Sequence, residues 1–300
     1  MNILTVFTGG TIASSITNGS ISPVQNQGGK SVLLTKFFDR FPEYKTQINF
    51  DCRFTLNKLS ENMTPNDWEV IVRELYNTDL SQYGAVFITH GSDTLAYFAA
   101  MLSVVFGNCK TPIFVIASDK VLDDDTANGL INLKAAADAA LSERLSGVWV
   151  PYKNSDKDEA TLHRGYQIVQ SQILGANFYS LQAKQFCTDK KPVSFNDNVI
   201  VLKCFVGADF SRINIKSGDQ ILLELYHGAT APLCAVAKLT DRAKAAGAEV
   251  YAASLTGGAE IYETTAELIN SGVKFFTDLT LETAYAVLLA VCEDEALNAD

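Results

Sequence analysis

Two short segments place hydroxyl groups directly after apolar runs. Residues 3–15 (ILTVFTGGTIASS) lead through two glycines to Thr11, and residues 86–100 (VFITHGSDTLAYFAA) lead through a glycine to Ser92 and Asp93. Each apolar run is typical of a strand buried on both faces, and glycine is where such a strand can turn sharply. Ligands of open α/β sheets bind beyond the carboxyl ends of the strands. We therefore expect both loops at one ligand-binding edge.

The chemistry that these side chains favour is acyl transfer. A hydroxyl group can attack a carbonyl carbon, and backbone N–H groups at a helix start stabilise the resulting oxyanion. Each loop alone has a simpler interpretation: residues 8–11 (TGGT) as a turn or phosphate loop, and residues 91–94 (GSDT) as a helix cap. Neither has the glycine spacing of a dinucleotide or Walker loop. His90 alone is interpreted as a structural histidine at a strand end.

Strands and helices alternate along the first half of the chain. This order predicts an α/β fold with a mainly parallel, flavodoxin-like or Rossmann-like sheet flanked by helices. The expected strands are 3–7, 48–54, 84–91, 111–118 and 147–152, and the expected helices are 31–41, 64–80, 93–107 and 128–143. Thr64 is the expected N-cap of the second helix, and the polar run 153–159 is expected to be an exposed hairpin tip.

The chain is predicted to have two domains. Residues 1–185 form the expected N-terminal catalytic α/β domain. Hydrophobic periodicity lapses around Pro192, so residues 186–198 are the predicted linker. The alternation then resumes, which predicts a smaller α/β C-terminal domain over residues 199–300.

Composition and charge narrow the classes of function. The 300 residues are 47% hydrophobic and carry a net charge of −10, which indicates a globular protein and argues against nucleic acid and anionic membranes as partners. The chain shows no span-length apolar stretch and no basic leader, so a cytoplasmic protein is expected. The six cysteines are far apart and mostly in apolar surroundings, which favours buried thiols over disulfides. No spacing resembles a metal ligand set, so we expect no metal and no nucleotide cofactor.

Taken together, residues 8–14 (TGGTIAS) and 90–103 (HGSDTLAYFAAMLS) resemble the two signature segments of the L-asparaginase family. Four further segments are similar to the family's substrate loop, to the start of its next helix and to its smaller C-terminal domain: 59–68, 126–140, 226–232 and 269–289. The resemblance implies hydrolysis of the side-chain amide of L-asparagine to aspartate and ammonia through an acyl-enzyme. It also implies a homodimer or homotetramer and a small-molecule amino-acid amide as substrate.

The resemblance also assigns residues to roles. Thr11 matches the family's nucleophile, and Ser92 matches its second hydroxyl, which is usually a threonine. Asp93 matches the carboxylate that pairs with the substrate's α-amino group, as suits an acceptor-only side chain. The other expected substrate-binding residues are Ser60 and Glu61, with the backbone amides of Gly10 and Gly91.

Two family residues are not found. The family's lysine falls on Gln170 in one register and on Gln167 in another, and a neutral amide cannot take up a proton. The residues considered as replacements are Lys120, Lys153, His163 and Arg164, although His163 is more simply interpreted as a polar surface residue. The family's mobile tyrosine would fall near Ile21 and Ser22, within a Gly/Asn/Gln-rich segment, 18–29, that we expect to serve as a lid.

Three functions remain open from the sequence. The first is an amidohydrolase of the asparaginase type, and the second is an amidase acting on glutamine or another amino-acid amide. The third is a catalytically impaired homologue that binds an amino acid. Thr11, Ser92 and Asp93 favour an enzyme, whereas the missing lysine favours the binding protein.

Overall fold

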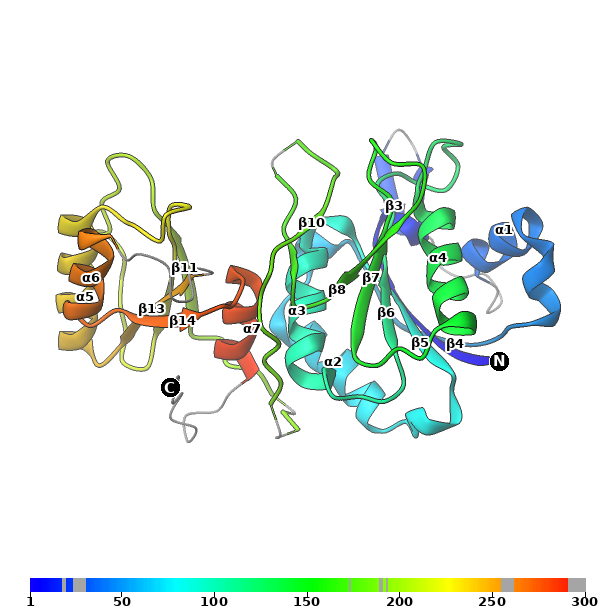
Figure 1. The fold of residues 1–300 in the computed structure, drawn as a ribbon, viewed down its shortest axis with the longest axis horizontal. Helices are drawn as coiled ribbons and strands as arrows, with labels where there is room; N and C mark the ends of the chain where they lie inside the picture. Colours follow the sequence, from blue (N-terminus) through cyan, green and yellow to red (C-terminus); the bar gives the residue numbers. More distant parts are fainter. Residues whose placement is uncertain are drawn as a thin grey trace.

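Two large β-sheets lie in a row, and helix α7 (Leu281–Ala290) lies between the second sheet and helix α3 (Leu95–Phe106) of the first (Figure 1). The computed structural model describes residues 1–17, 20–23, 31–172, 174–188, 191–192, 194–254 and 262–290. The first sheet has the order β4-β1-β5-β6-β7-β8 and is parallel except for its last strand. Its strands are β1 (Asn2–Gly9), β4 (Asn49–Lys58), β5 (Ala85–Thr89), β6 (Ile113–Ile116), β7 (Val148–Tyr152) and β8 (Thr161–Arg164). This confirms the predicted α/β fold with a mainly parallel sheet.

The alternation of side chains along β1 decides which helices cover which face. Ile3 and Phe7 pack with α1 (Val32–Arg40) and α4 (Gly129–Ser142), whereas Leu4 and Val6 pack with α2 (Pro65–Tyr76) and α3 (Leu95–Phe106). Successive residues of a strand point to opposite faces, so an apolar run requires helices on both. The backbone N–H of Thr64 donates to the Asp67 carboxylate at 2.9 Å, and α2 begins directly after Thr64 as predicted.

The second sheet is smaller and fully parallel, in the order β11-β12-β13-β14. Its strands are β11 (Val199–Lys203), β12 (Gln220–Glu224), β13 (Glu249–Ser254) and β14 (Lys274–Thr277). Ile221 and Val250 face α5 (Leu233–Ala246) and α6 (Glu263–Asn270). Leu222 and Tyr251 face the other way and join the core that contains α7 (Leu281–Ala290) and α3. The two sheets therefore share a hydrophobic core through α7.

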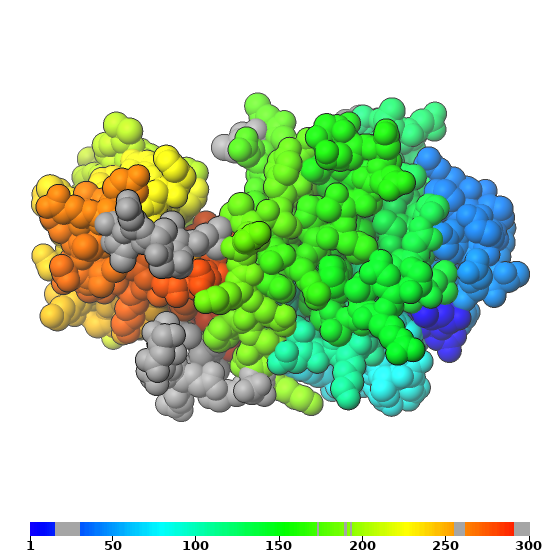
Figure 2. Space-filling view, viewed as in Figure 1, coloured from blue at the N-terminus to red at the C-terminus, as the bar shows by residue number. Residues whose placement is uncertain are grey.

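The segment that connects the two sheets, residues 181–198, runs along α3 and α2 of the first sheet. Among its described residues, 181–198 contain no helix or strand, but the Thr188 N–H donates to the Val104 carbonyl at 2.9 Å. The Phe195 N–H donates to the Glu69 carboxylate at 2.7 Å. Figure 2 shows the surface indented where the N-terminal and C-terminal regions meet. The domain boundaries drawn above stay a prediction.

Short elements complete the described chain. The antiparallel pairs are β2 (Ser14–Thr17) with β3 (Ser20–Pro23) and β9 (Ile168–Val169) with β10 (Tyr179–Ser180). None of the described helices combines the length and the apolar character that a membrane crossing needs.

The described cysteines are free thiols, but they are not uniformly buried. Cys204 is buried, whereas Cys234 is exposed. The expectation of a buried thiol was wrong for Cys234 because α5 turns Val236, Leu239 and Ala243 inward, which places Cys234 on the opposite side of the helix. Cys292 lies outside the described residues.

Candidate functional site

Three loops meet at the carboxyl ends of β4, β1 and β5, which are neighbours in the sheet. The Thr8 N–H donates to Thr89 Oγ1 at 3.2 Å, which joins the ends of β1 and β5. A Cβ atom added to Gly10 would lie 2.4 Å from the nitrogen of Gly91, and one added to Gly91 would lie 2.3 Å from Ser60 Oγ. The structure therefore brings together the loops that carry Thr11, Ser92 and Ser60.

The two glycines before Thr11 make this approach possible. Gly9 and Gly10 have φ angles of 106° and 79°, a backbone region that L side chains rarely adopt. A Cβ atom on Gly9 would also lie 2.3 Å from the Lys58 carbonyl oxygen. Because both positions exclude a side chain, the double glycine lets the chain leave β1 and press against its neighbours.

The expected role of the Gly10 amide is corrected by the structure. Its N–H donates to the Lys58 carbonyl at 2.9 Å, because the pairing of β1 with β4 extends as far as Gly9. It is therefore not a free donor for a substrate, and the contribution of Gly10 is conformational.

The side chains of Thr11, Ser92 and Asp93 are not used to build the fold. Thr11 begins η1 (Thr11–Ala13) and Ser92 begins η6 (Ser92–Thr94); both are half-buried, and Asp93 is exposed. No side chain caps η6 or α3, so the interpretation of residues 91–94 as a helix cap was wrong. Within the described chain, no hydrogen bond or ion pair engages the side chains of these three residues. They are free to contact a ligand.

Ser60 contributes a buried hydroxyl to the same place. It begins η4 (Ser60–Asn62), is 1% exposed, and its Oγ is buried without a hydrogen-bond partner in the described structure. The Thr94 hydroxyl donates to the Ser60 carbonyl at 3.3 Å, which ties η4 to η6. Glu61, next in the chain, is exposed. A buried hydroxyl without a partner is costly, which is consistent with a ligand completing its hydrogen bonds.

His90 supports the loops from beneath. Its ring stacks on Phe98 with centroids 4.2 Å apart, and its Nε2 lies 3.0 Å from the Thr94 hydroxyl. Complete burial lowers the pKa of His90 to about 3, so the ring is neutral. This agrees with its interpretation as a structural histidine.

Gln170, rather than Gln167, reaches the site. The Gln170 amide Nε2 donates to the backbone carbonyl of Asp93, and its Oε1 is buried without a partner among the described residues. Gln167 instead donates to the Ala183 carbonyl at 3.3 Å. The sequence left both registers open, and the structure places only Gln170 beside the loop of Ser92.

Comparison with known proteins agrees with this geometry. A family model described as "Asparaginase, N-terminal" matches residues 2–194, more than half of the chain. The chain belongs to the asparaginase family.

Solved structures show the same fold. The thermostable L-asparaginase from Thermococcus kodakarensis is 23% identical, with a TM-score of 0.74 over 98% of this chain and 94% of that one. L-asparaginase I from Vibrio cholerae is 21% identical, with a TM-score of 0.70 over 96% and 92% of the two chains.

Curated relatives are subunits D of glutamyl-tRNA(Gln) amidotransferase. The one from Archaeoglobus fulgidus is 29% identical over 182 residues, which are 60% of this chain and 41% of the relative. The one from Methanosphaera stadtmanae is 24% identical over 96% of this chain and 71% of the relative. The match thus spans about two fifths of the first relative's length.

None of the four residues considered as replacements for the asparaginase lysine makes a side-chain hydrogen bond or ion pair with the three loops in the described structure. Arg164 stacks over the Trp149 ring at 3.8 Å. His163 is buried, with Nδ1 2.7 Å from Ser180 Oγ. Its interpretation as a surface residue was wrong because β8 pairs with β7 and buries this side chain at the sheet edge. Lys153 is half-buried, and its side chain makes no hydrogen bond or ion pair with described residues.

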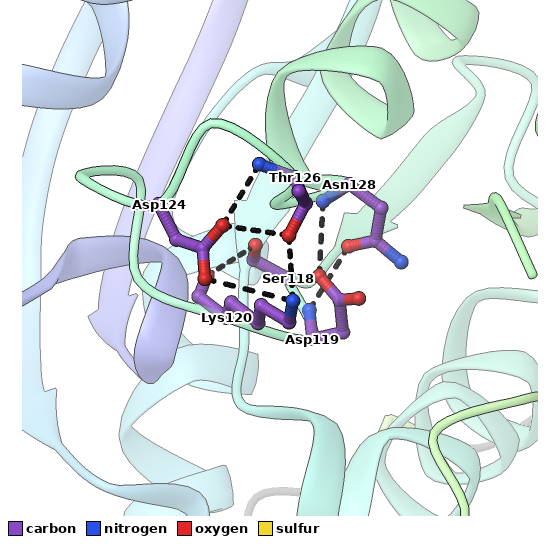
Figure 3. A network of polar contacts seen from close by, with 6 residues as sticks. All are labelled: Ser118, Asp119, Lys120, Asp124, Thr126 and Asn128. Atoms are coloured by element: carbon purple, nitrogen blue, oxygen red, sulfur yellow. Dashed lines mark hydrogen bonds and ion pairs between the residues drawn. The ribbon is translucent and has the colours of Figure 1, made fainter. Parts of the chain in front are cut away.

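Lys120 is held within its own loop (Figure 3). Its Nζ lies 2.5 Å from the Thr126 hydroxyl and 3.5 Å from the Asp124 carboxylate. Asp119 and Asn128 close the loop with two reciprocal hydrogen bonds of 2.9 Å between side chain and backbone. The ammonium group of Lys120 is therefore paired within the loop that precedes α4.

Sequence reasoning missed one residue near the site. Glu282, at the start of α7, accepts a hydrogen bond from the Gln170 N–H at 2.7 Å and is 4% exposed. Burial raises the pKa of Glu282, and the nearby Glu224 raises it further. The available signal was a single charged residue at the start of the apolar run 281–289. The expected lid, 18–29, lies largely outside the described residues, and of Ile21 and Ser22 only the backbone, in β3, is described.

Proposed function

We propose that the protein is an amidohydrolase that cleaves the side-chain amide of an amino acid, with L-asparagine as the first candidate substrate. The observation that carries the proposal is the convergence of three strand-end loops on Thr11, Ser92, Asp93 and Ser60. In the described chain these four side chains have no hydrogen-bond partner of their own.

Each group has a role in this reaction. The Asp93 carboxylate pairs with the substrate's ammonium group, and the Ser60 hydroxyl donates to its α-carboxylate. Thr11 Oγ attacks the side-chain amide carbon, and an ester forms as the carbon–nitrogen bond breaks. The proton of the Thr11 hydroxyl passes to the amide nitrogen, which leaves as ammonia. Water then cleaves the ester, which releases aspartate and restores the Thr11 hydroxyl. In this proposal, Ser92 binds the attacking water or relays the proton.

The slowest step is expected to be the transfer of the Thr11 hydroxyl proton. Gln170 occupies the side of the loop where the resemblance places a lysine, and its amide cannot accept the Thr11 proton. The loss of a general base costs roughly a hundredfold to ten-thousandfold in rate. We therefore expect slow turnover.

The test is ammonia release by the purified protein from L-asparagine, L-glutamine and their D-forms. Thr11→Ala should abolish release from whichever amide is the substrate. Thr111→Ala, which removes a half-buried hydroxyl bound to the Leu80 carbonyl, should leave it unchanged. Turnover by Thr11→Ala at the wild-type rate would refute the mechanism.

A second candidate function is amino-acid binding without turnover, and Gln170 is the observation that favours it. Calorimetry with L-asparagine separates the two. Heat of binding without any ammonia supports the binding protein, and ammonia release supports the enzyme.

A further inference from the structure

The first turn of α7 is bonded to the segment that carries Gln170. Glu282 Oε1 accepts the Gln170 N–H at 2.7 Å, and the Thr283 hydroxyl donates to the Tyr166 carbonyl at 3.2 Å. Thr280 Oγ1 accepts the Thr283 N–H at 3.1 Å, which fixes the start of the helix. Helix α7 thus holds residues 166–170 at both ends. Glu282 lies 112 positions after Gln170 in the sequence.

Glu282 is an unusual side chain for this position. It is 4% exposed, in a helix whose other residues pack into the shared core. Nearby, the Tyr97 and Tyr285 rings meet edge to face with centroids 5.5 Å apart. A buried carboxyl group is costly unless hydrogen bonds compensate it. The Glu282 carboxyl group accepts such a hydrogen bond from the N–H of Gln170, in a distant part of the chain.

Gln170 passes this contact on to the candidate site. Its Nε2 donates to the backbone carbonyl of Asp93. This carbonyl follows Ser92 and Asp93, the two expected substrate contacts of η6, and precedes the start of α3. Its buried Oε1 has no partner in the described structure. A continuous path of two hydrogen bonds therefore runs from Glu282 through Gln170 to Asp93.

We propose that Glu282 is a positioning residue that sets the orientation of the Asp93 loop through Gln170. The expected effect of Glu282 on turnover rests on the proposed function, whereas the expected effect of Glu282 on the Asp93 loop does not. The carboxyl group acts as a hydrogen-bond acceptor, so its charge is not required. A small displacement of a group that orients the substrate costs up to about a hundredfold in rate.

Three variants isolate this role. Glu282→Ala removes the acceptor, and Glu282→Gln keeps an acceptor oxygen of the same reach. Glu69→Ala is the matched control, because Glu69 also accepts a backbone N–H at 2.7 Å, that of Phe195, but on α2. Hydrogen exchange is measured on peptides that cover residues 90–95 and 166–172, beside kcat and KM for the amide that the wild type hydrolyses.

We expect Glu282→Ala to speed exchange over both peptides by about fivefold or more. It should lower kcat/KM about tenfold to a hundredfold. Glu282→Gln should stay within about threefold of wild type in both readouts, and Glu69→Ala should not alter exchange over residues 90–95.

The proposal is overturned if Glu282→Ala leaves exchange over residues 90–95 unchanged, or if Glu69→Ala loosens that peptide equally. If Glu282→Ala does not fold, Gln170→Leu breaks the second bond of the path, and unchanged exchange over residues 90–95 there overturns it as well. A wild type that releases no ammonia would refute the proposed function alone, because the exchange measurement still decides the inference.

Discussion

At the scale of single residues, the candidate site is distinguished by side chains that the fold does not use. The hydroxyls of Thr11 and Ser92 and the carboxylate of Asp93 have no partners in the described chain, although their loops touch through Gly10 and Gly91. Buried polar groups in folded proteins are normally hydrogen-bonded, and the Ser60 hydroxyl beside these three is buried without a partner in the described structure. In the proposed function, the substrate completes the hydrogen bonds of Ser60 and contacts the three accessible groups.

Gln170 gives the first prediction at this scale. Gln170→Lys introduces an amine that can donate to the Asp93 carbonyl as the amide does, and that can also exchange a proton. If the missing base limits the rate, kcat for ammonia release should rise about tenfold or more. A kcat that stays unchanged, with the variant folded, would show that the base is not what limits turnover.

The buried side chain of His163 should make the free energy of unfolding depend on pH. Burial lowers the pKa of His163 from 6.5 to about 4. The unfolded chain therefore binds a proton more readily than the folded chain below pH 6.5. The contribution of neutral His163 is complete above pH 6.5 and is lost as pH falls to about 4, on the order of 3 kcal/mol.

His163→Gln should accordingly flatten the fall of the free energy of unfolding between pH 6.5 and pH 4. Denaturant titrations at a series of pH values measure it. His227→Gln, at an exposed position, is the control and should keep the wild-type slope. Equal slopes for wild type and His163→Gln would contradict the lowered pKa.

At the scale of elements, the sequence predicted the strands and helices better than their long-range contacts. The apolar run of β1 and Thr64 at the start of α2 are local signals, and both predictions were confirmed. The bond between Glu282 and Gln170 joins residues 112 positions apart, so no local pattern could predict it. The loss of the Gly10 amide to Lys58 likewise depends on how far β1 pairs with β4, which the sequence of β1 does not determine.

Helix α7 carries the prediction at this scale. It packs against α3 and against the second sheet within one core, and Leu288 is buried there. Leu288→Ala should lower the free energy of unfolding by about 2 to 5 kcal/mol. Ile269→Ala, at an exposed position of α6, should change it by less than about 0.5 kcal/mol.

Two probes show whether α7 couples the sheets. Both tryptophans, Trp68 and Trp149, belong to the first sheet's region, whereas circular dichroism reports on both sheets. The two signals should give one coincident transition, which Leu288→Ala moves as a whole. A separate transition seen by circular dichroism alone would mean that the second sheet unfolds independently.

At the scale of the whole molecule, the surface suggests where a second copy would contact this one. Val206 is 93% exposed, and Tyr262 is also exposed. Both line a hollow of about 600 Å³ beyond the carboxyl ends of β11 and β12. Tyr226, also exposed, lines the same hollow, and a contiguous apolar patch marks an interaction surface, whereas a single exposed apolar side chain does not.

The resemblance implies a homodimer or homotetramer, and we expect light scattering to give two or four times the chain mass of 32.6 kDa. Val206→Glu should lower that mass, because it places a charge in the contact. Val70→Glu, at an exposed position of α2, should leave it unchanged. A wild type that is monomeric at all concentrations would contradict the expectation.

The most direct test of the account is a crystal structure of the protein with L-aspartate, the product of the proposed reaction. We predict one aspartate among the three loops, with its side-chain carboxylate against Thr11 and Ser92, its α-carboxylate on Ser60 and its ammonium group on Asp93. Aspartate bound elsewhere, with Thr11 and Ser92 facing separate cavities, would contradict it.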